Sequence, residues 1–358
     1  MKALVTGSNG LIGANLVREL IRRGHRVRAF LRKTSDQRGL QDLPVEIVSG
    51  DVLDLDSLCN AARGCDVVFH AAAIFSYSGT SAAELERLAV EGTVNAIKAA
   101  HSQRVKRVVL TSSSVVMGSS NRPLVRNEED RLDEQENVPY IRAKELQERA
   151  AVNQADELGV EMVMVCPTVT VGPHDYRLGP SNGIIVSYLN DISKATYPGG
   201  CNIVSARDVA KGHLLAAQKG TSGERYLLGC ENLHWAAIHS MISELCGVPG
   251  PSWQANHTVS LLAATAWEFA SKLTRTPPLT TRNQARMVGR YYWYEHQKAA
   301  RLGYRPRPAR TALAEAIAWL SASPHISRQT RAALRLSREV FRAKKTLEVD
   351  EARIRASA

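Results

Sequence analysis

The sequence predicts an α/β fold in which a doubly wound parallel sheet of the Rossmann type is joined to a smaller, irregular C-terminal domain. Two observations lead to this prediction. Short apolar runs and segments of helical period alternate from the first residue onward, as in repeated strand–helix–strand units. In addition, a glycine-rich turn at residues 6–13 separates the first apolar run from the first helical segment.

The predicted elements follow one another regularly over the first half of the chain. Apolar runs, which we expect to form strands, occupy residues 2–6, 26–31, 45–48, 67–71, 108–111 and 160–166. Helical periodicity is found at residues 11–23, 55–62, 82–101 and 140–157. Gly159 follows the last of these segments and is a typical residue to end a helix.

The regular alternation stops after Gly172 and Pro173. Segments rich in Gly, Pro, Ser and Asn then alternate with short helical segments. We therefore expect a first domain at residues 1–170, a second domain at residues 171–320 that is interleaved with the first, and a basic tail at residues 321–358.

The composition of the 358 residues is that of a globular protein, because 44% are hydrophobic and 23% are charged. Disordered, collagen-like and coiled-coil classes are thereby excluded. The chain has no apolar run of membrane-spanning length and no secretory signal pattern, so we expect a cytoplasmic protein. Its six cysteines form no CxxC pair and no zinc-site spacing, which favours a reducing compartment.

The glycine-rich turn has the spacing of a phosphate-binding turn. Its first glycine permits a tight turn, its second lets a pyrophosphate approach the backbone, and its third packs helix on strand. The phosphates would lie at the N-terminus of the helix, where free amide groups favour an anion. The residues expected to contact a dinucleotide here are Gly7, Asn9, Gly10, Leu11, Ile12 and Gly13.

The end of the second predicted strand indicates which dinucleotide is bound. A carboxylate there binds the ribose 2′-hydroxyl of NAD, whereas an arginine accommodates the 2′-phosphate of NADP. This strand ends with Arg32 and Lys33 and no carboxylate, which predicts NADP(H), with NAD as the alternative. Asp51 and Val52 follow the third strand and are placed to contact the adenine; the competing interpretation is that Asp51 caps the next helix.

Tyr140 and Lys144 are four residues apart and therefore share one face of a helix. The pKa of a tyrosine is ordinarily about 10, and a neighbouring ammonium and an oxidised nicotinamide are expected to favour the phenolate. Tyr140 would exchange the proton that accompanies hydride transfer, while Lys144 would reach the cofactor hydroxyls. Ser113, at the end of an apolar run, would donate a hydrogen bond to a substrate carbonyl.

These motifs together resemble the extended short-chain dehydrogenase/reductase family over residues 1 to about 320. The resemblance is carried by residues 6–13, 50–52, 70–73, 111–113, Tyr140 with Lys144, 167–168 and 172–173. Residues 172–175, 208–213, 223–226, 229–232 and 302–306 resemble its dihydroflavonol-reductase-like branch, especially the bacterial hopanoid-associated sugar epimerases. By this resemblance, Ser113, Tyr140 and Lys144 are the catalytic residues.

The resemblance also implies further contacts with the cofactor. Pro167 and Thr168 would flank the nicotinamide, and Ala71, Ala72 and Ala73 would line the cofactor site.

Two positions depart from the family pattern. Ala89 stands where the family commonly has an asparagine, and Cys166 precedes Pro167 where the family commonly has arginine or asparagine. The first departure removes a structural or proton-relay group, and the second changes the floor of the predicted site.

Reduction of a ketone or aldehyde by NADPH is the function that these residues favour, because Arg32 does not suit an epimerase that retains NAD. The alternatives are a sugar or sugar-lipid epimerase of the hopanoid-associated type and a non-catalytic NADP-binding sensor. Intact Tyr140 and Lys144 argue against the sensor. Since dimers are usual in the family, a homodimer is expected.

The net charge of +11 is concentrated toward the C-terminus, where residues 321–358 contain nine Lys or Arg and four Asp or Glu. Five arginines recur at helical steps and would form one stripe, namely Arg328, Arg331, Arg335, Arg338 and Arg342. A helix of this kind either lies on an anionic membrane surface or packs on the domain with its basic face in solvent. Nucleic acid is not an expected partner, because no recognition module is present.

Two further groups of residues were weighed as site candidates. His174 and His213 have no carboxylate partner at metal-binding spacing, so we expect no metal. The aromatic run at residues 291–294 either lines the substrate pocket or belongs to the core.

Overall fold

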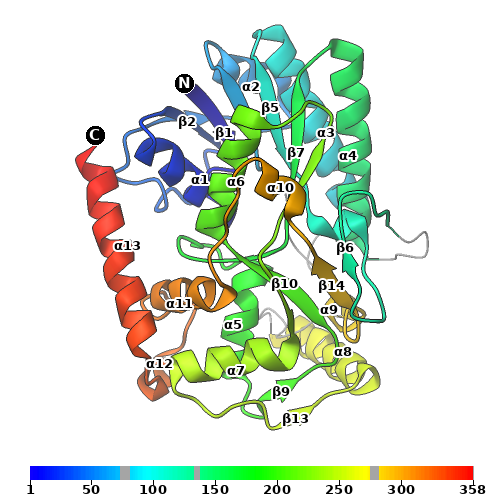
Figure 1. The fold of residues 1–358 in the computed structure, drawn as a ribbon, viewed down its shortest axis with the longest axis vertical. Coiled ribbons are helices and arrows are strands. Elements are labelled where there is room, and N and C mark those ends of the chain that lie inside the picture. Colours follow the sequence, from blue (N-terminus) through cyan, green and yellow to red (C-terminus); the bar gives the residue numbers. More distant parts are fainter. Residues whose placement is uncertain (73–80, 133–137, 275–281, 358) are drawn as a thin grey trace.

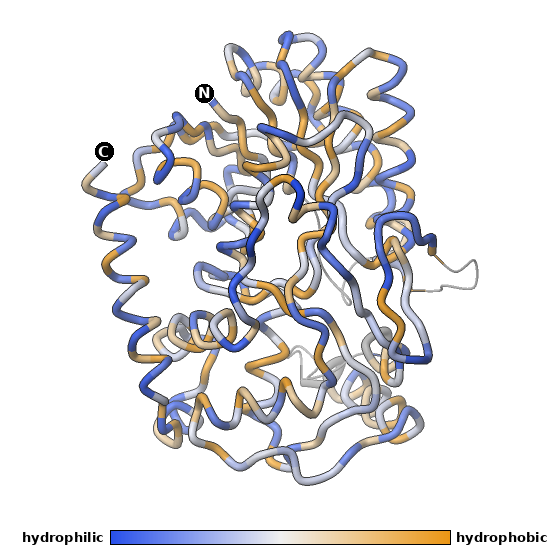
Figure 2. Tube along the Cα trace, in the orientation of Figure 1, coloured by the Kyte–Doolittle hydropathy of each residue, from blue (hydrophilic) through white to orange (hydrophobic). Residues whose placement is uncertain are grey.

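The computed structural model describes residues 1–72, 81–132, 138–274 and 282–357 (Figure 1). Its main feature is a sheet of seven parallel strands in the order β3-β2-β1-β4-β5-β7-β11. These strands are β1 (Lys2–Thr6), β2 (Arg26–Leu31), β3 (Val45–Ser49), β4 (Val67–His70), β5 (Arg107–Thr111), β7 (Met162–Pro167) and β11 (Arg225–Leu228). Figure 2 shows hydrophobic residues concentrated along the strands of this sheet.

Helices cover both faces of the seven-stranded sheet. They are α1 (Leu11–Arg22) and α6 (Ala206–Lys219) on one face and α2 (Leu55–Ala62), α3 (Ala82–Ser102) and α4 (Pro139–Leu158) on the other. Along β1, Ala3 and Val5 join the core beneath α1 and α6, whereas Leu4 joins the core beneath α2, α3 and α4. This alternation of side chains buries both faces, as a doubly wound sheet requires. The predicted fold class is confirmed.

The element boundaries follow local sequence signals closely. The predicted limits of β2 and α2 are those of the structure, and α1 begins at the predicted Leu11. Helix α4 ends where Gly159 adopts φ 65°, and the amide of Val160 still donates to the carbonyl of Ala155. Strand β7 therefore begins at Met162, two residues later than the apolar run predicted.

A second, smaller sheet is built mainly from residues after β7. It has the order β12-β10-β14-β6, and β8 pairs with β10. Its strands are β6 (Val125–Arg126), β8 (Val169–Val171), β10 (Gly200–Ser205), β12 (Glu231–His234) and β14 (Tyr291–Tyr294). The remaining short elements are η1 (Ser114–Met117), β9 (Ala195–Thr196), β13 (Trp253–Gln254), α9 (Arg282–Ala285) and α10 (Gln297–Arg301).

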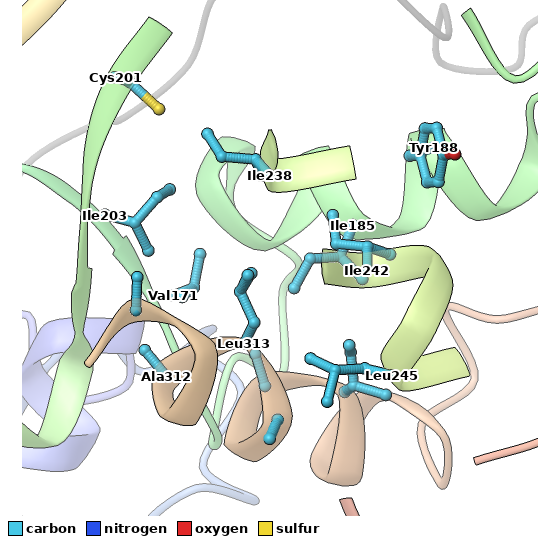
Figure 3. Close-up of a cluster of buried hydrophobic side chains, with 14 of the residues drawn as sticks. Val171, Ile185, Tyr188, Cys201, Ile203, Ile238, Ile242, Leu245, Ala312 and Leu313 are labelled. Atoms are coloured by element: carbon cyan, nitrogen blue, oxygen red, sulfur yellow. The ribbon is translucent and has the colours of Figure 1, made fainter. Parts of the chain in front are cut away.

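The larger helices of this part are α5 (Pro180–Asn190), α7 (Trp235–Cys246), α8 (His257–Thr274) and α11 (Ala309–Leu320). Figure 3 shows how the second core forms, with Ile203 of β10 and Val171 of β8 facing Leu313 of α11 and Ile242 of α7. The chain returns to the first sheet through α6 and β11. The two parts are thus interleaved along the sequence.

The aromatic run at residues 291–294 is divided between two environments by the alternation of strand β14. Tyr292 and Tyr294 are buried in the second core. Tyr291 and Trp293 are half-buried on the other side, where both rings lie edge-on to His234.

The C-terminal residues form two helices, α12 (Arg328–Ala333) and α13 (Arg338–Ala356). The predicted single stripe of Arg328, Arg331, Arg335, Arg338 and Arg342 is therefore wrong, since the chain between the two helices is extended and hydrogen-bonded to the end of α7. The amides of Arg335 and Ser337 donate there to the carbonyls of Cys246 and Leu245. Within the described ranges, no helix is long and apolar enough to cross a membrane.

Helix α13 runs from α11 to α1 along the side of the molecule (Figure 1). Arg18 of α1 makes a two-pronged ion pair with Glu351, at 2.7 and 2.8 Å. Arg310 of α11 pairs in the same way with Glu339. The helix therefore connects the Rossmann part to the second core.

A buried ionic cluster joins α6 to α11. Arg307 precedes α11 and donates to Asp208 of α6 at 3.0 Å and to Glu315 of α11 at 2.6 Å. Both carboxylates are almost fully buried. Burial by itself would raise the pKa of Asp208, but Arg307 and Lys211 outweigh it, and the pKa is lowered.

We predict that Arg307→Met lowers the free energy of unfolding by about 3 kcal/mol, because it leaves two buried carboxylates without their main cation. Chemical denaturation measures this loss. The control is Arg310→Met, which removes only half-exposed ion pairs and should cost less than about 1 kcal/mol.

The loss in Arg307→Met should also depend on pH. Since the pKa of Asp208 is lowered in the folded protein, the ion pair stabilises at neutral pH and stops doing so as the pH falls through that lowered pKa. A deficit in Arg307→Met that is unchanged in acid would show that charge pairing is not its cause.

Candidate active site

The candidate site lies where the carboxyl ends of β1, β4, β5 and β7 meet at one edge of the parallel sheet. Strands β2 and β4 pair with opposite sides of β1, so the chain crosses the sheet in opposite directions on either side of this point. Ligands of doubly wound folds bind at such a reversal. The structure brings there the glycine-rich turn after β1, residues 71–72 after β4, residues 112–113 after β5 and Thr168 after β7.

The glycine-rich turn is packed directly against the chain that leaves β4. Gly7 has φ 66°, and a Cβ at this position would lie 2.7 Å from the carbonyl oxygen of Ala71 and from the amide of Ala72. A Cβ on Gly13 would lie 2.1 Å from the carbonyl oxygen of Gly7. The hydroxyl of Thr6 accepts the amide of Ala72 at 3.2 Å. Only glycine fits at the first and third positions of this turn.

The first turn of α1 is arranged to receive an anion. Gly10 is its N-cap and provides no side-chain cap, and no acidic residue stands in the first turn. The guanidinium of Arg177 lies over the turn, 3.4 Å from where a Cβ of Gly10 would be. Free helix amides and a cation together suit the pyrophosphate of a dinucleotide. The residues of this turn therefore fit the predicted cofactor.

Arg177 was missed by the sequence analysis. It lies in an irregular segment far from the turn in sequence, and its only signal was a positive charge shortly after Gly172 and Pro173.

The end of β2 presents exposed cations beside this turn. Arg32 and Lys33 are both exposed, and the ion pairs found within the described ranges include neither of them. Asn9 connects the turn to the same loop, because its side-chain amide donates to the carbonyl of Asp36 at 3.2 Å. The nearby Asp36 is paired with Arg38. The position predicted for a 2′-phosphate thus carries two cations that remain available.

The residues after β3 form the adenine side of the predicted site. Asp51 accepts the amide of Leu53 at 3.0 Å, while Asp54 caps α2 through the amides of Asp56 and Ser57. The interpretation of Asp51 as the helix cap is therefore wrong. Val52 packs on α3, where the side chain of Asn95 donates to its carbonyl. Ala73, a predicted cofactor contact, lies outside the described residues.

The cluster of Ser113, Tyr140 and Lys144 is brought together at the end of β5. All three residues are buried, and Tyr140 and Lys144 lie one turn apart on α4. The ammonium of Lys144 donates to the carbonyl of Thr111 at 3.1 Å and to the side-chain oxygen of Gln147 at 2.8 Å. Ser113 follows Thr111 by two residues and hydrogen-bonds the phenol of Tyr140.

Burial controls the protonation of this cluster. It raises the pKa of Tyr140 to about 12, although the hydrogen bond with Ser113 acts in the opposite direction. The pKa of Lys144 is lowered to about 8 by burial, with Glu148 opposing the shift. The sequence led us to expect a lowered pKa for Tyr140. In the chain by itself the pKa is raised instead, because loss of water disfavours the phenolate more than the hydrogen bond with Ser113 favours it.

A second buried ionic group lies behind Lys144, and sequence analysis did not find it. Glu148 is one helical turn beyond Lys144, and burial raises the pKa of its carboxyl group. It accepts the thiol of Cys166 at 3.6 Å and lies 3.5 Å from the guanidinium of Arg225 on β11. The cysteine that replaces the common family residue thus contacts a carboxyl group. In the sequence, the signal that could have identified Glu148 is its spacing of four residues from Lys144.

Gln147 and Thr93 connect Lys144 to α3. The side-chain amide of Gln147 donates to the hydroxyl of Thr93 at 2.8 Å. Ala89, the other departure from the family pattern, lies one turn earlier on α3 and is half-buried.

The floor of the site is fixed by Asn202. Its side chain accepts the hydroxyl of Thr168 at 2.8 Å and the amide of Cys230 at 2.8 Å, and it donates to Asn232 at 2.7 Å. Pro167 forms the last position of β7, opposite Leu228. Through these contacts the second sheet determines where the predicted nicotinamide neighbours lie.

Of the two histidines considered from sequence, His213 is buried and His174 is half-buried, and both lie in other contacts. His213 lies between the hydroxyl of Thr111 at 2.9 Å and the carbonyl of Val209 at 2.8 Å. His174 lies 3.9 Å from Glu351 of α13. Over the ranges that the structure covers, no group of three or more His, Cys, Asp or Glu side chains is placed to hold a metal ion.

The fold and the site define the class of protein. A glycine-rich turn at a helix N-terminus and a Ser–Tyr–Lys cluster at the same sheet edge are those of a Rossmann-type NAD(P)-binding protein. The sequence model of the NAD dependent epimerase/dehydratase family matches residues 3–229. The chain belongs to this family, the extended short-chain dehydrogenases/reductases.

Individual relatives agree with this assignment. The chain is 33% identical over 341 residues to a Synechocystis sp. protein provisionally named dihydroflavonol 4-reductase, covering 91% of this chain and 96% of that protein. It is 35% identical over 260 residues to cinnamoyl-CoA reductase 1 of Oryza sativa subsp. japonica, covering 67% and 75%. The crystal structure of gox2253 matches with a TM-score of 0.79 and 31% identity, over 91% of this chain and 99% of that one.

These similarities support the dihydroflavonol-reductase-like branch of the family. The chain is therefore an enzyme.

We predict that the stability of the protein without added cofactor depends on pH through Lys144. Its folded pKa of about 8 lies below the ordinary value, so the unfolded chain binds more protons between these values and stability rises with pH. Relative to Lys144→Met, the wild type should gain about 2 kcal/mol between pH 7.5 and 9.5.

Denaturant titrations of both proteins across this pH range measure the effect. Lys98→Met, which replaces an exposed lysine of α3, is the control and should show no such trend. Parallel pH curves for the wild type and Lys144→Met would contradict a lowered lysine pKa.

Proposed function

We propose that the protein is an NADPH-dependent reductase of a ketone or aldehyde. The observation that carries the proposal is the buried pair of Ser113 and Tyr140, in which the serine side chain is hydrogen-bonded to a phenol that is protonated at neutral pH. A protonated tyrosine beside a hydrogen-bonding serine is ready to act as an acid toward a carbonyl oxygen. The names of the reductases to which the chain is similar agree with this direction of reaction.

In this proposal each member of the cluster has its own role. The hydroxyl of Ser113 orients the substrate carbonyl, and Tyr140 donates the proton that its oxygen takes up. Lys144 is held by Thr111 and Gln147, and its ammonium would bind the cofactor hydroxyls. Bound nicotinamide supplies the hydride, and Pro167 and Thr168 would flank its ring.

NADPH is the proposed cofactor because of the end of β2. Arg32 and Lys33 are exposed cations at the place where a 2′-phosphate would lie. The glycine-rich turn, together with Arg177, would hold the pyrophosphate.

An epimerase that recycles bound NAD is the second candidate. The name of the family model favours it, because that model covers residues 3–229 and therefore the whole Ser–Tyr–Lys cluster. Denaturing the purified protein and identifying any released nucleotide separates the two candidates. Firmly retained NAD would favour the epimerase, whereas exchangeable NADPH favours the reductase.

We predict that Arg32→Ser combined with Lys33→Ser weakens NADPH binding about tenfold or more and leaves NADH binding unchanged, because only NADPH carries the 2′-phosphate. Fluorescence titration with each nucleotide measures both affinities. Arg26→Ser is the control, since Arg26 is exposed at the opposite end of the same strand. An equal loss for both nucleotides would refute the proposed phosphate contact.

We predict that Tyr140→Phe lowers kcat by at least about 100-fold while NADPH affinity changes little, because it removes the proton donor and keeps the ring. Steady-state kinetics with a panel of ketones and aldehydes, together with nucleotide titration, test this. If Tyr140→Phe is fully active toward a substrate that the wild type reduces, another acid must serve. If it supports the cellular role of the protein without any turnover, the non-catalytic sensor is favoured.

A further inference from the structure

Gln147 is a buried polar side chain of helix α4 that lies between Lys144 and helix α3. Its exposed fraction is 0%, and that of Thr93 on α3 is 1%, so water does not compete for their contacts. The side-chain oxygen of Gln147 accepts the ammonium of Lys144 at 2.8 Å, and its side-chain amide donates to the hydroxyl of Thr93 at 2.8 Å. A buried glutamine with partners for both its oxygen and its nitrogen is held in one position.

The direction of this amide is determined by its partners. An ammonium group donates hydrogen bonds and accepts none, so the side-chain oxygen of Gln147 must face Lys144 and the nitrogen must face away. A hydroxyl both donates and accepts, and Thr93 therefore suits the nitrogen. The contacts run in one sense, from Lys144 through Gln147 to Thr93 on α3.

Lys144 is thereby held from two sides by uncharged oxygens. Its other partner is the main-chain carbonyl of Thr111, at the end of β5, at 3.1 Å. An ammonium has three donors, and among the contacts of the described residues these two leave one donor for a bound ligand. Because neither acceptor carries a charge, the two contacts fix the ammonium without neutralising it.

The charged and titratable groups around Lys144 act on it at longer range. They are Tyr140 and Glu148 on α4, His70 on β4, Cys166 on β7 and, behind Glu148, Arg225 on β11. Burial, with a smaller effect of the lysine charge, lowers the pKa of His70 to about 3, so its ring is neutral. Burial raises the pKa of the Cys166 thiol. The ion pairs of the described residues do not include Lys144, since Glu148 pairs with Arg225.

We propose that Gln147 is a positioning residue for cofactor binding. It holds the ammonium of Lys144 against the end of β5, so that the remaining donor meets a cofactor hydroxyl and the positive charge stays available to the cofactor. The inference rests on the proposed role of Lys144 toward the cofactor hydroxyls. It is independent of the choice between NADPH and NADH, because both nucleotides carry the same nicotinamide ribose.

The first test is a double-mutant cycle on nucleotide affinity, measured by fluorescence titration with NADPH and with NADH. Gln147→Leu should weaken binding of both nucleotides about tenfold, because Lys144 loses the acceptor that directs it. Lys144→Met should weaken binding at least as much. Adding Gln147→Leu to Lys144→Met should cause little further loss, since the two residues act through one contact.

The matched control is Gln154→Leu, the same substitution further along α4. The side chain of Gln154 donates to Glu157 in an exposed contact. Gln154→Leu should bind both nucleotides as the wild type does.

The second test omits the nucleotide and follows the charge of Lys144 through stability. Gln147→Glu keeps the size of the side chain and its acceptor oxygen but adds a negative charge, which raises the pKa of Lys144. The folded lysine then holds its proton as firmly as the unfolded one. Relative to Lys144→Met, the rise in stability between about pH 7.5 and 9.5 should therefore disappear in Gln147→Glu, whereas in Gln147→Leu it should begin at lower pH.

Denaturant titrations measure these shifts, which a glutamine that merely fills the space between α3 and α4 would not produce. Circular dichroism verifies that each variant is folded. Gln147→Glu keeps the test decisive where Gln147→Leu does not fold.

Three results would overturn the proposal. If Lys144→Met binds weakly but a folded Gln147→Leu binds normally, or if their losses simply add, Gln147 does not direct the lysine. If Lys144→Met itself binds normally, the proposed role of Lys144 is refuted and the inference fails with it. If Gln147→Glu keeps the wild-type rise in stability with pH, residue 147 does not act on the ammonium.

Discussion

The backbone contact between the ends of β1 and β4 is the constraint on which the site depends. At Gly7 the two chains approach so closely that a single Cβ would collide with the carbonyl of Ala71. This approach directs the glycine-rich turn into α1 and leaves the first helix amides facing the sheet edge. Because parallel strands end at the same edge, every other candidate residue is positioned relative to this contact.

Burial of Lys144 is the second organising feature, and it is costly in free energy. The ammonium is separated from water, and its compensation comes from the carbonyl of Thr111, the amide oxygen of Gln147 and the nearby Glu148. The same loss of water raises the pKa of the Tyr140 phenol. One environment therefore lowers the pKa of the lysine to about 8 and raises that of the tyrosine to about 12.

The two sheets are not independent supports for this chemistry. Asn202 of β10 fixes Thr168 at the end of β7, while Arg307 connects α6 beneath the first sheet to α11 beneath the second. Strand β11 returns to the first sheet, and its Arg225 approaches Glu148 behind Lys144. Polar contacts thus connect the second core to the floor of the candidate site.

The sequence by itself determined the Rossmann elements up to β7 almost residue by residue, because those elements depend on local signals such as apolar period, glycine spacing and the helix end at Gly159. It did not predict that α6 and β11 complete the same sheet. It also indicated Ser113, Tyr140 and Lys144, whose roles stay predictions, although the structure does bring them together. Tertiary structure alone placed Arg177 over Gly10 and Cys166 against Glu148. It also interrupted the predicted arginine stripe. These features rest on contacts between distant segments, and the amount of water that such contacts exclude also decides the protonation of Tyr140 and Lys144.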